Sequence, residues 1–215
     1  MKQRAFSLVE LLVVMVIIGI IAMLTMPAFN NLGKAQALTS AGSSLLDQLA
    51  LARQMAVAQN RVVEVRLYKR RENPAQAVST ANPERFRSFR TMIYDENVVN
   101  AFAQTTLQDF PARMVLSEEK DYSTLIFPYT NTVPSRAYQK ETLSSAETNV
   151  DYQVIRFKPT GGTDLSITGT PDSNRWFLTI KSDNPEKDVP TGRPANNYFT
   201  VLLDPVSGRV RTYRP

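Results

Sequence analysis

The chain has no cysteine and no histidine among its 215 residues. Without cysteine, structural disulfides, zinc–thiolate centres and lipidation of a cysteine are excluded. Without histidine, the chain lacks the most common general base and the imidazole metal ligand, so Ser-His-Asp and Cys-His catalysis are ruled out. Carboxylate or lysine chemistry would survive these absences. We nevertheless expect that the chain is not an enzyme and that it uses no cofactor.

Strong charge of either sign is also missing. Charged residues make up 21% of the chain and the net charge is +5, with basic residues spread along the sequence. This mild excess permits contact with nucleic acid or anionic lipid without requiring it. The hydrophobic content of 43% is ordinary for a folded domain. The length suits one globular domain and a terminal helix.

One long apolar run stands at the amino terminus. Lys2 and Arg4 precede Phe6, and no charged residue occurs from Leu11 to Met26. Phe6 to Met26 is about the ~20 residues that a helix needs to cross a bilayer. Glu10 lies at the start of this run. A charged side chain at the centre of a membrane costs at least ~2.5 kcal/mol, so a charge in such a segment is expected to have a partner.

Three interpretations of this segment compete. The apolar core of a cleaved secretory signal spans about 7–15 residues, and this run is longer. A plain signal anchor explains the length and the positive residues at the start, but not Glu10. A signal that is cut just before Phe6 would supply a free amine as the counter-ion of Glu10. The third interpretation accounts for the most observations.

The same stretch closely resembles the amino terminus of type IV pilins and type II secretion pseudopilins. In that family a short basic leader is followed by Phe, and Glu stands at the fifth mature position. The resemblance implies cleavage between Ala5 and Phe6 and N-methylation of Phe6, with Glu10 as the assembly residue. The leaders usually end in Gly, so Ala5 departs from the pattern. Pro27 falls where many pilins carry a proline that kinks the helix.

The resemblance also implies partners and a location. The expected partners are other pilin or pseudopilin subunits, a prepilin peptidase, an inner-membrane assembly platform and the membrane itself. Before assembly the chain would be a single-pass inner-membrane protein with a cytoplasmic amino terminus and a periplasmic head, and afterwards part of a fibre. A neighbouring subunit's amine would neutralise Glu10. The alternative is an interfacial Glu10 that is hydrated at the membrane surface.

Beyond Pro27 the helical period resumes. Apolar side chains recur on one face, namely Leu38, Ala41, Leu45, Leu49, Ala52 and Ala56. The polar side chains Ser43, Asp47, Gln48 and Gln54 lie largely off this face. The pattern predicts an amphipathic helix that packs on a soluble domain and stops near Asn60. We therefore expect a leader (1–5), a transmembrane and assembly helix (6–27), its amphipathic continuation (28–60) and a β-rich head (61–215).

The remainder alternates between short strands and loops. Expected strands are a first one through Val63, Val65 and Leu67, then Phe89–Tyr94, Met114–Leu116, Thr124–Phe127, Tyr152–Phe157, Trp176–Lys181, Tyr198–Leu203 and Arg209–Tyr213. The segment Asn97–Gln108 is expected to form a short helix. Long loops are expected at Lys69–Arg87 and Tyr129–Asn149, and turns at Lys158–Gly162 and Asp204–Gly208. The fold class is therefore α+β, with a long amino-terminal helix packed against an antiparallel sheet or sandwich.

Later motifs resemble the H-type minor pseudopilins and the FimT group. They are the Ala- and Arg-containing helix end at Leu49–Asn60, the turn Phe157–Gly161, and Gly208-Arg209-Val210-Arg211. The ending, Arg214-Pro215 directly after the last expected hairpin, also resembles that of the pilin-like Verru_Chthon cassette protein D family. Within this resemblance, the absence of cysteine favours a minor or specialised subunit over a major pilin, because many major pilins link their carboxy-terminal region with a disulfide.

Three arginines gather near the carboxyl terminus. Arg209, Arg211 and Arg214 lie on or beside the last expected strand, with Tyr213 between them. They suggest an alternative function, a minor pilin that binds nucleic acid during DNA uptake, with guanidinium groups on phosphates and Tyr213 for stacking. An ordinary solvated strand face with Val210 turned inward explains the same pattern. No metal site is expected.

Overall fold

The fold is taken from a computed structural model of the chain. It describes residues 8–95, 100–128, 137–165, 176–183 and 197–214, and the side chains within them except those of 24–32, 95, 100 and 101. The chain divides into two compact units, Met1–Gln36 and Ala37–Pro215. In the described part of the chain, no helix is both long enough and apolar enough to span a membrane.

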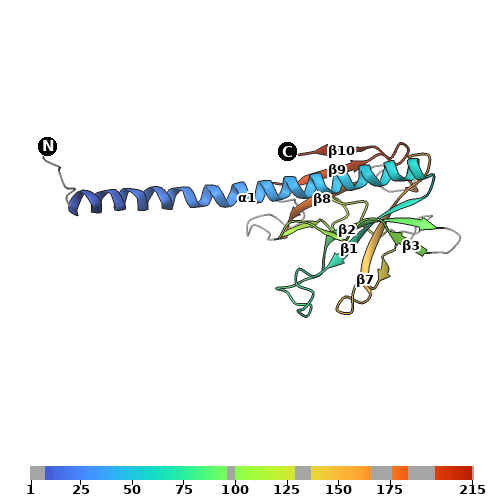
Figure 1. The fold of residues 1–215 in the computed structure, drawn as a ribbon, viewed down its shortest axis with the longest axis horizontal. Helices are drawn as coiled ribbons and strands as arrows, with labels where there is room; N and C mark the ends of the chain where they lie inside the picture. Colours follow the sequence, from blue (N-terminus) through green and yellow to red (C-terminus); the bar gives the residue numbers. More distant parts are fainter. Residues whose placement is uncertain (1–7, 96–99, 129–136, 166–175, 184–196, 215) are drawn as a thin grey trace, which may run out of the picture. The chain divides into compact units, whose positions relative to one another are not determined.

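Helix α1 runs from Leu8 to Gln59 (Figure 1). It ends at the predicted residue, because Asn60 adopts a left-handed backbone with φ 51°. The amide of Arg61 then donates to the carbonyl of Ala56 at 3.2 Å, which closes the last turn. Asn tolerates the left-handed region better than most residues, so it is a suitable cap for this end.

The second unit contains a six-stranded sheet. Its order is β3-β2-β1-β7-β6, with β4 also paired to β2. The strands are β1 (Val63–Arg70), β2 (Arg85–Asp95), β3 (Asn100–Ala103), β4 (Gln108–Asp109), β6 (Gln139–Glu141) and β7 (Val150–Phe157). All pairs are antiparallel. Strand β1 lies at the centre, so both its edges are hydrogen-bonded.

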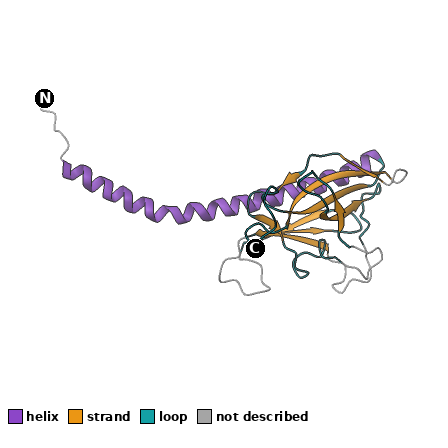
Figure 2. Cartoon of the chain, turned by 90° about the horizontal axis from the view of Figure 1, so that it is seen from below, coloured by secondary structure: helices purple, strands orange, loops and turns teal. Residues whose placement is uncertain are grey.

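A four-stranded antiparallel sheet completes this unit. Its order is β10-β9-β8-β5. The strands are β5 (Met114–Leu116), β8 (Trp176–Ser182), β9 (Phe199–Leu203) and β10 (Val210–Tyr213). Figure 2 shows the strands of both sheets gathered beside the carboxy-terminal part of α1. The α+β prediction is therefore confirmed, with antiparallel strands following the amino-terminal helix.

One core joins the helix to both sheets. The predicted apolar stripe of α1 is buried at all six positions, from Leu38 to Ala56. It packs in one cluster with the inward residues of both sheets, such as Leu67 and Trp176. Gly42 permits a close approach of α1 to β9, because a Cβ there would lie 2.6 Å from the ring of Phe199. The helical period thus correctly predicts which side of α1 the head covers.

Three element predictions were wrong. Asn97–Gln108 contains β3 and the start of β4 in place of a helix, because β2 offers a pairing edge to both segments; residues 96–99 lie outside the described residues. Thr124–Phe127 forms turns, with the amide of Leu125 bonded to the carbonyl of Phe177. The expected loop Tyr129–Asn149 contains strand β6, which pairs with β7.

Gln48 was also misplaced by the pattern. It lies off the apolar stripe but is only 4% exposed. Its amide donates to the hydroxyls of Thr91 and Thr105, which satisfies the buried group. Hydrogen bonding to β2 and to the segment after β3 therefore brings a polar residue into the covered side of the helix.

Candidate functional site

The amino-terminal part of α1 presents apolar side chains all round. The large hydrophobic residues from Leu8 to Met23 are each between 48% and 81% exposed within this chain. A helix that is apolar on every side needs an apolar environment, either a membrane or other apolar helices. Glu10 lies in the first turn, among these side chains, and is exposed.

Several predicted site residues lie at or beyond the edge of what the structure describes. Ala5 and Phe6, the predicted cleavage site, are outside the described residues. The helix is assigned through position 27, but the side chain of Pro27 belongs to the undescribed stretch 24–32. Cleavage at Ala5, methylation of Phe6, assembly through Glu10 and a kink at Pro27 all stay predictions.

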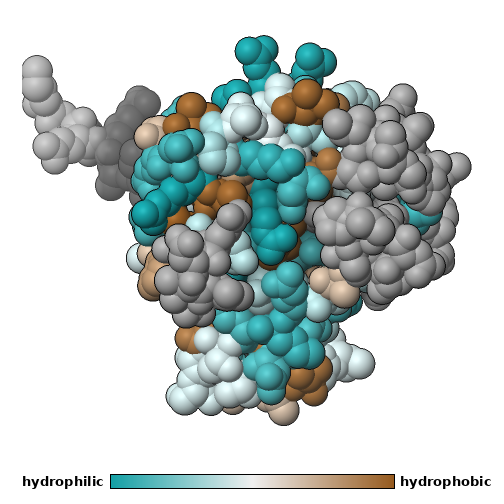
Figure 3. Space-filling view, turned by 90° about the vertical axis from the view of Figure 1, so that its right-hand side faces the viewer, coloured by the Kyte–Doolittle hydropathy of each residue, from teal (hydrophilic) through white to brown (hydrophobic). Residues whose placement is uncertain are grey.

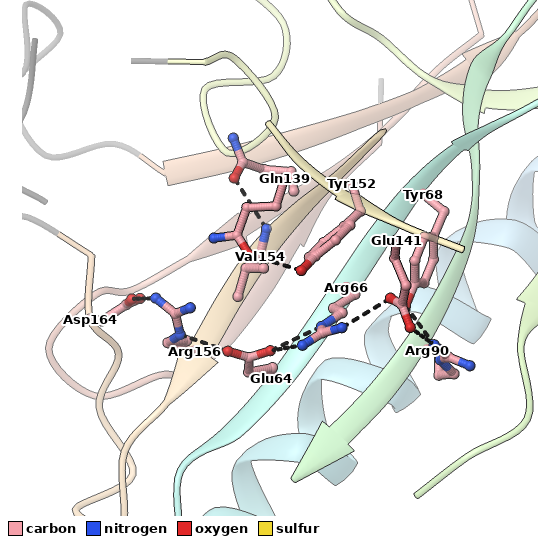
Figure 4. A network of polar contacts seen from close by, with 11 residues as sticks. Glu64, Arg66, Tyr68, Arg90, Gln139, Glu141, Tyr152, Val154, Arg156 and Asp164 are labelled. Atoms are coloured by element: carbon pink, nitrogen blue, oxygen red, sulfur yellow. Dashed lines mark hydrogen bonds and ion pairs between the residues drawn. The ribbon is translucent and has the colours of Figure 1, made fainter. Parts of the chain in front are cut away.

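The outer face of the six-stranded sheet carries a polar network that the sequence did not reveal (Figure 4). At its centre is Glu64 of β1, which is 1% exposed. One carboxylate oxygen accepts from Nε of Arg156 at 2.8 Å, and the other lies 2.9 Å from a guanidinium nitrogen of Arg66. Arg156 reaches on to Asp164 at 3.5 Å.

Glu141 of β6 forms the second centre of the network. It accepts from Arg66 at 2.9 Å, from the hydroxyl of Tyr68 at 2.7 Å and from Arg90 at 2.6 Å. Burial alone would raise the pKa of Glu141, but the hydrogen bonds from Tyr68 and Arg66 and the charges of Arg66 and Arg90 outweigh it and leave this pKa below its ordinary value. Burial raises the pKa of the Tyr68 hydroxyl. Glu141 therefore stays ionised between its cations.

Aromatic rings cover this network. The guanidinium of Arg66 lies 4.7 Å from the ring centre of Tyr152, and that of Arg90 lies 5.5 Å from the ring centre of Tyr68. A small apolar cluster of Tyr68, Val150, Tyr152 and Val154 surrounds them. The network neutralises its own charges and buries them, which is the arrangement of a structural element.

The alternation in β1 predicts which side chains point away from the main core, but it does not predict which residues cover them. Glu64, Arg66 and Tyr68 read as the solvated side of a half-buried strand, yet Glu64 and Tyr68 are fully buried. The available signal was the Tyr that alternates with Glu and Arg, since a large aromatic side chain is rarely left in water on a sheet face.

A second cluster ties the end of α1 to two turns. Nε of Arg53 donates to the carbonyls of Gly161 at 3.1 Å and Ser207 at 2.8 Å. Gly208 has φ 63°, and a Cβ there would lie 2.2 Å from the carbonyl oxygen of Gly161. The hydroxyl and amide of Thr163 both donate to the carbonyl of Pro205. The turn that ends at Gly161 and the turn that ends at Gly208 are thus in direct backbone contact with each other.

The predicted arginines at the carboxyl terminus separate into two kinds. Arg209 and Arg211 are exposed, and strand alternation places Arg211 and Tyr213 on the same outward side. Arg214 instead donates to the hydroxyl of Thr39 at 2.7 Å, so it fastens β10 to the helix. Binding of nucleic acid by these residues stays a prediction. The described residues hold no group of acidic side chains suited to a metal ion.

The comparisons with known proteins bear on the amino terminus. Residues 1–26 match the family model described as the prokaryotic N-terminal methylation motif. Two solved structures are similar to the chain. The minor pseudopilin EpsH from the type 2 secretion system of Vibrio cholerae has 10% identity and a TM-score of 0.44, over 83% of this chain and 97% of that one. The type IV minor pilin FimU of Pseudomonas aeruginosa has 14% identity and a TM-score of 0.43, over 83% and 92%.

A search of the curated proteins finds no match. The assignment therefore concerns the amino terminus, and the matched range includes the basic leader, Phe6 and Glu10. The chain carries the N-terminal methylation motif of prepilin-type leaders over residues 1–26.

Proposed function

We propose that this chain is a minor subunit of a type IV pilus-like or type II secretion pseudopilus fibre. The observation that carries the proposal is the match of residues 1–26 to the N-terminal methylation motif. The apolar side chains exposed along α1 from Leu8 to Met23 support it, because such a surface suits first a bilayer and then a bundle of like helices.

The proposed processing creates a cation that can pair with Glu10 of another subunit. A prepilin peptidase cuts between Ala5 and Phe6, and Phe6 becomes the methylated amino terminus. In the fibre, the amine of one subunit neutralises Glu10 of its neighbour within an apolar core. A mis-registered neighbour would leave both charges unpaired, at a cost of several kcal/mol (about 3–5 for a broken buried pair). Pairing therefore selects one axial register.

In this proposal, the segment of residues 6–27 holds the chain in the inner membrane before assembly, with Lys2 and Arg4 on the cytoplasmic side and the head in the periplasm. The subunit contacts other pilin-like subunits and an inner-membrane assembly platform. We infer a structural role without enzymatic activity, supported by a chain that offers neither His nor Cys for acid–base or nucleophilic chemistry.

The test is the mass of the mature amino terminus in cells that produce the chain. We expect a chain that begins with methylated Phe6. An Ala5→Leu variant should accumulate uncut, because a bulky residue replaces the small one at the cleavage site, whereas Ala5→Gly should be processed at least as well as the natural chain. A natural chain that still begins at Met1, or that is cut after Met26, would refute the proposal.

A further inference from the structure

The outer faces of the two sheets differ in how far their arginines are paired with carboxylates. Arginines on or beside the strands of the six-stranded sheet are paired with carboxylates, namely Arg66, Arg70, Arg85, Arg87, Arg90 and Arg156. Nearly all of these arginines are largely buried, with side-chain exposures from 8% to 32%; Arg85, at 43%, is the exception. This face satisfies its own charges and has little left to offer a charged partner.

The outer face of the four-stranded sheet pairs Lys181 of β8 with Glu119, but over β9 and β10 it is arranged differently. In β9, Val201 and Leu203 point into the core, so Leu202 between them points outward. Cross-strand register places Arg211, Leu202 and Phe177 in one row over β10, β9 and β8. Leu202 is 37% exposed, a large fraction for an aliphatic side chain in a central strand.

Aromatic and cationic groups surround Leu202. Tyr213, in the next row, is 60% exposed, and its ring centre lies 6.5 Å from that of Tyr198. Arg209 and Arg211 are exposed, and among the described residues neither forms an ion pair with a carboxylate. The nearest acidic group is Asp204, whose pKa is lowered by hydrogen bonds from Ser207 and Val206 and also by the charge of Arg211. Protein interfaces are enriched in Tyr, Phe and Arg, and Tyr and Arg are among the residues that supply most of the binding energy.

We propose that the outer face of the four-stranded sheet, defined by Phe177, Tyr198, Leu202, Arg209, Arg211 and Tyr213, docks an acidic surface on the head of a neighbouring fibre subunit. The inference rests on the proposed function, since it requires a neighbour in the fibre. Leu202 and the tyrosines supply the desolvated centre, and the two arginines on the rim select an acidic partner. The opposite charge follows from the two exposed guanidinium groups, which outnumber the one carboxylate that lies near them, that of Asp204.

The composition favours a protein over a nucleic acid. Binding to nucleic acid draws its strength from many phosphate contacts, and this face offers two exposed arginines. The third terminal arginine, Arg214, is engaged with Thr39. An exposed Leu at the centre of the patch has no use in a phosphate groove, but it suits the apolar centre of a protein contact.

The experiment places a photo-crosslinking benzoylphenylalanine at Leu202 of the full chain in the cells that produce it. The matched control carries the same group at Val78, which is 60% exposed in the loop between β1 and β2. We expect irradiation to join position 202 to an acidic segment of a protein that has its own N-terminal methylation motif. Arg209→Glu with Arg211→Glu should lower the yield about tenfold, since attraction becomes repulsion.

Each other result overturns the docking proposal. These results are no adduct at position 202, an equal adduct at position 78, an adduct to nucleic acid or to a protein without the motif, and a yield that ignores the charge reversal. The mature amino terminus is measured in the same cells. A chain that begins at Phe6 but gives no adduct refutes only the docking surface, whereas a chain that begins at Met1 refutes the proposed function as well.

Discussion

Glu10 is the only acidic residue before Asp47 in the sequence, and it lies in the first turn of an otherwise apolar helix. If Glu10 pairs with a neighbour's amine, it stabilises only the assembled fibre. If Glu10 is hydrated at the membrane surface, its charge has no effect on assembly. The two hypotheses differ in what a neutral side chain of the same size would do.

We therefore predict that Glu10→Gln is processed normally but is lost from fibres. An unpaired amine in an apolar core costs several kcal/mol (about 3–5 when a buried pair is broken), so the amount recovered in sheared fibres should fall at least tenfold, as judged by immunoblot. Glu10→Asp keeps the charge on a shorter arm and should assemble to an intermediate extent. Normal recovery of the Gln variant would support the hydrated alternative.

Gly208 is a second single residue with a specific role. Its φ of 63° favours glycine, and a Cβ would overlap the carbonyl oxygen of Gly161. We predict that Gly208→Ala lowers the free energy of unfolding of the second unit, residues 37–215, by about 1–3 kcal/mol. Urea denaturation would measure this, with Thr212→Ala, an exposed position in β10, as the control. Equal midpoints for the two variants would contradict the contact between the turns.

At the scale of elements, the six-stranded sheet is held by charged as well as apolar contacts. Glu64 bridges β1 to Arg156 of β7, and Glu141 joins β6 to β1 and β2 through Arg66 and Arg90. The edge strand β6 is only three residues long. Because so short a strand forms few backbone hydrogen bonds, the side-chain contacts of Glu141 help to hold β6 on the sheet.

The pKa of Glu141 gives this sheet a pH dependence. Because this pKa is lowered in the folded chain, Glu141 contributes stability that is present above its unfolded pKa of about 4.5 and is lost as the pH falls through the lower, folded value. We predict that the head loses stability below about pH 4.5. Glu141→Gln should be less stable at neutral pH and lose less on acidification, as measured by thermal unfolding between pH 7 and pH 3.

The result for Glu141→Gln has a matched control in the same sheet. Lys140, the next residue along, forms an exposed ion pair with Asp151. Removing that pair should change stability by less than about 1 kcal/mol at any pH, because exposed ion pairs contribute little. If Lys140→Gln and Glu141→Gln unfold alike across this pH range, the buried network does not stabilise the head in the way proposed.

At the scale of the whole molecule, the chain separates two kinds of surface. The first unit exposes apolar side chains from Leu8 to Met23. The head, by contrast, shows mostly hydrophilic residues with small separate hydrophobic patches on the face that Figure 3 presents. The proposed passage from a membrane into a fibre would need both kinds of surface, since the first unit would bury its apolar side chains while the head stayed in water.

A feature of the fold could be predicted when it depends on residues near one another in the sequence, and not when it depends on contacts between distant residues. The stripe of α1 and its stop at Asn60 follow from a local period and a local backbone preference, so they were predicted correctly. The fate of residues 97–108 depended on the free edge of β2, and a local pattern cannot contain that information. The same holds for Gln48, whose partners lie more than 40 residues away.

The sequence by itself determined the amino-terminal motif, the apolar helix with Glu10 at its start, the amphipathic continuation and most of the strands, because each depends on neighbouring residues in the chain. Only the tertiary structure decided that Glu64 and Tyr68 are buried, that Arg53 clasps two turns, and that Arg214 binds Thr39 while Arg209 and Arg211 stay exposed. The physical reason is that the cost of burying a charge depends on its partners, and those partners come from strands and turns distant in the sequence.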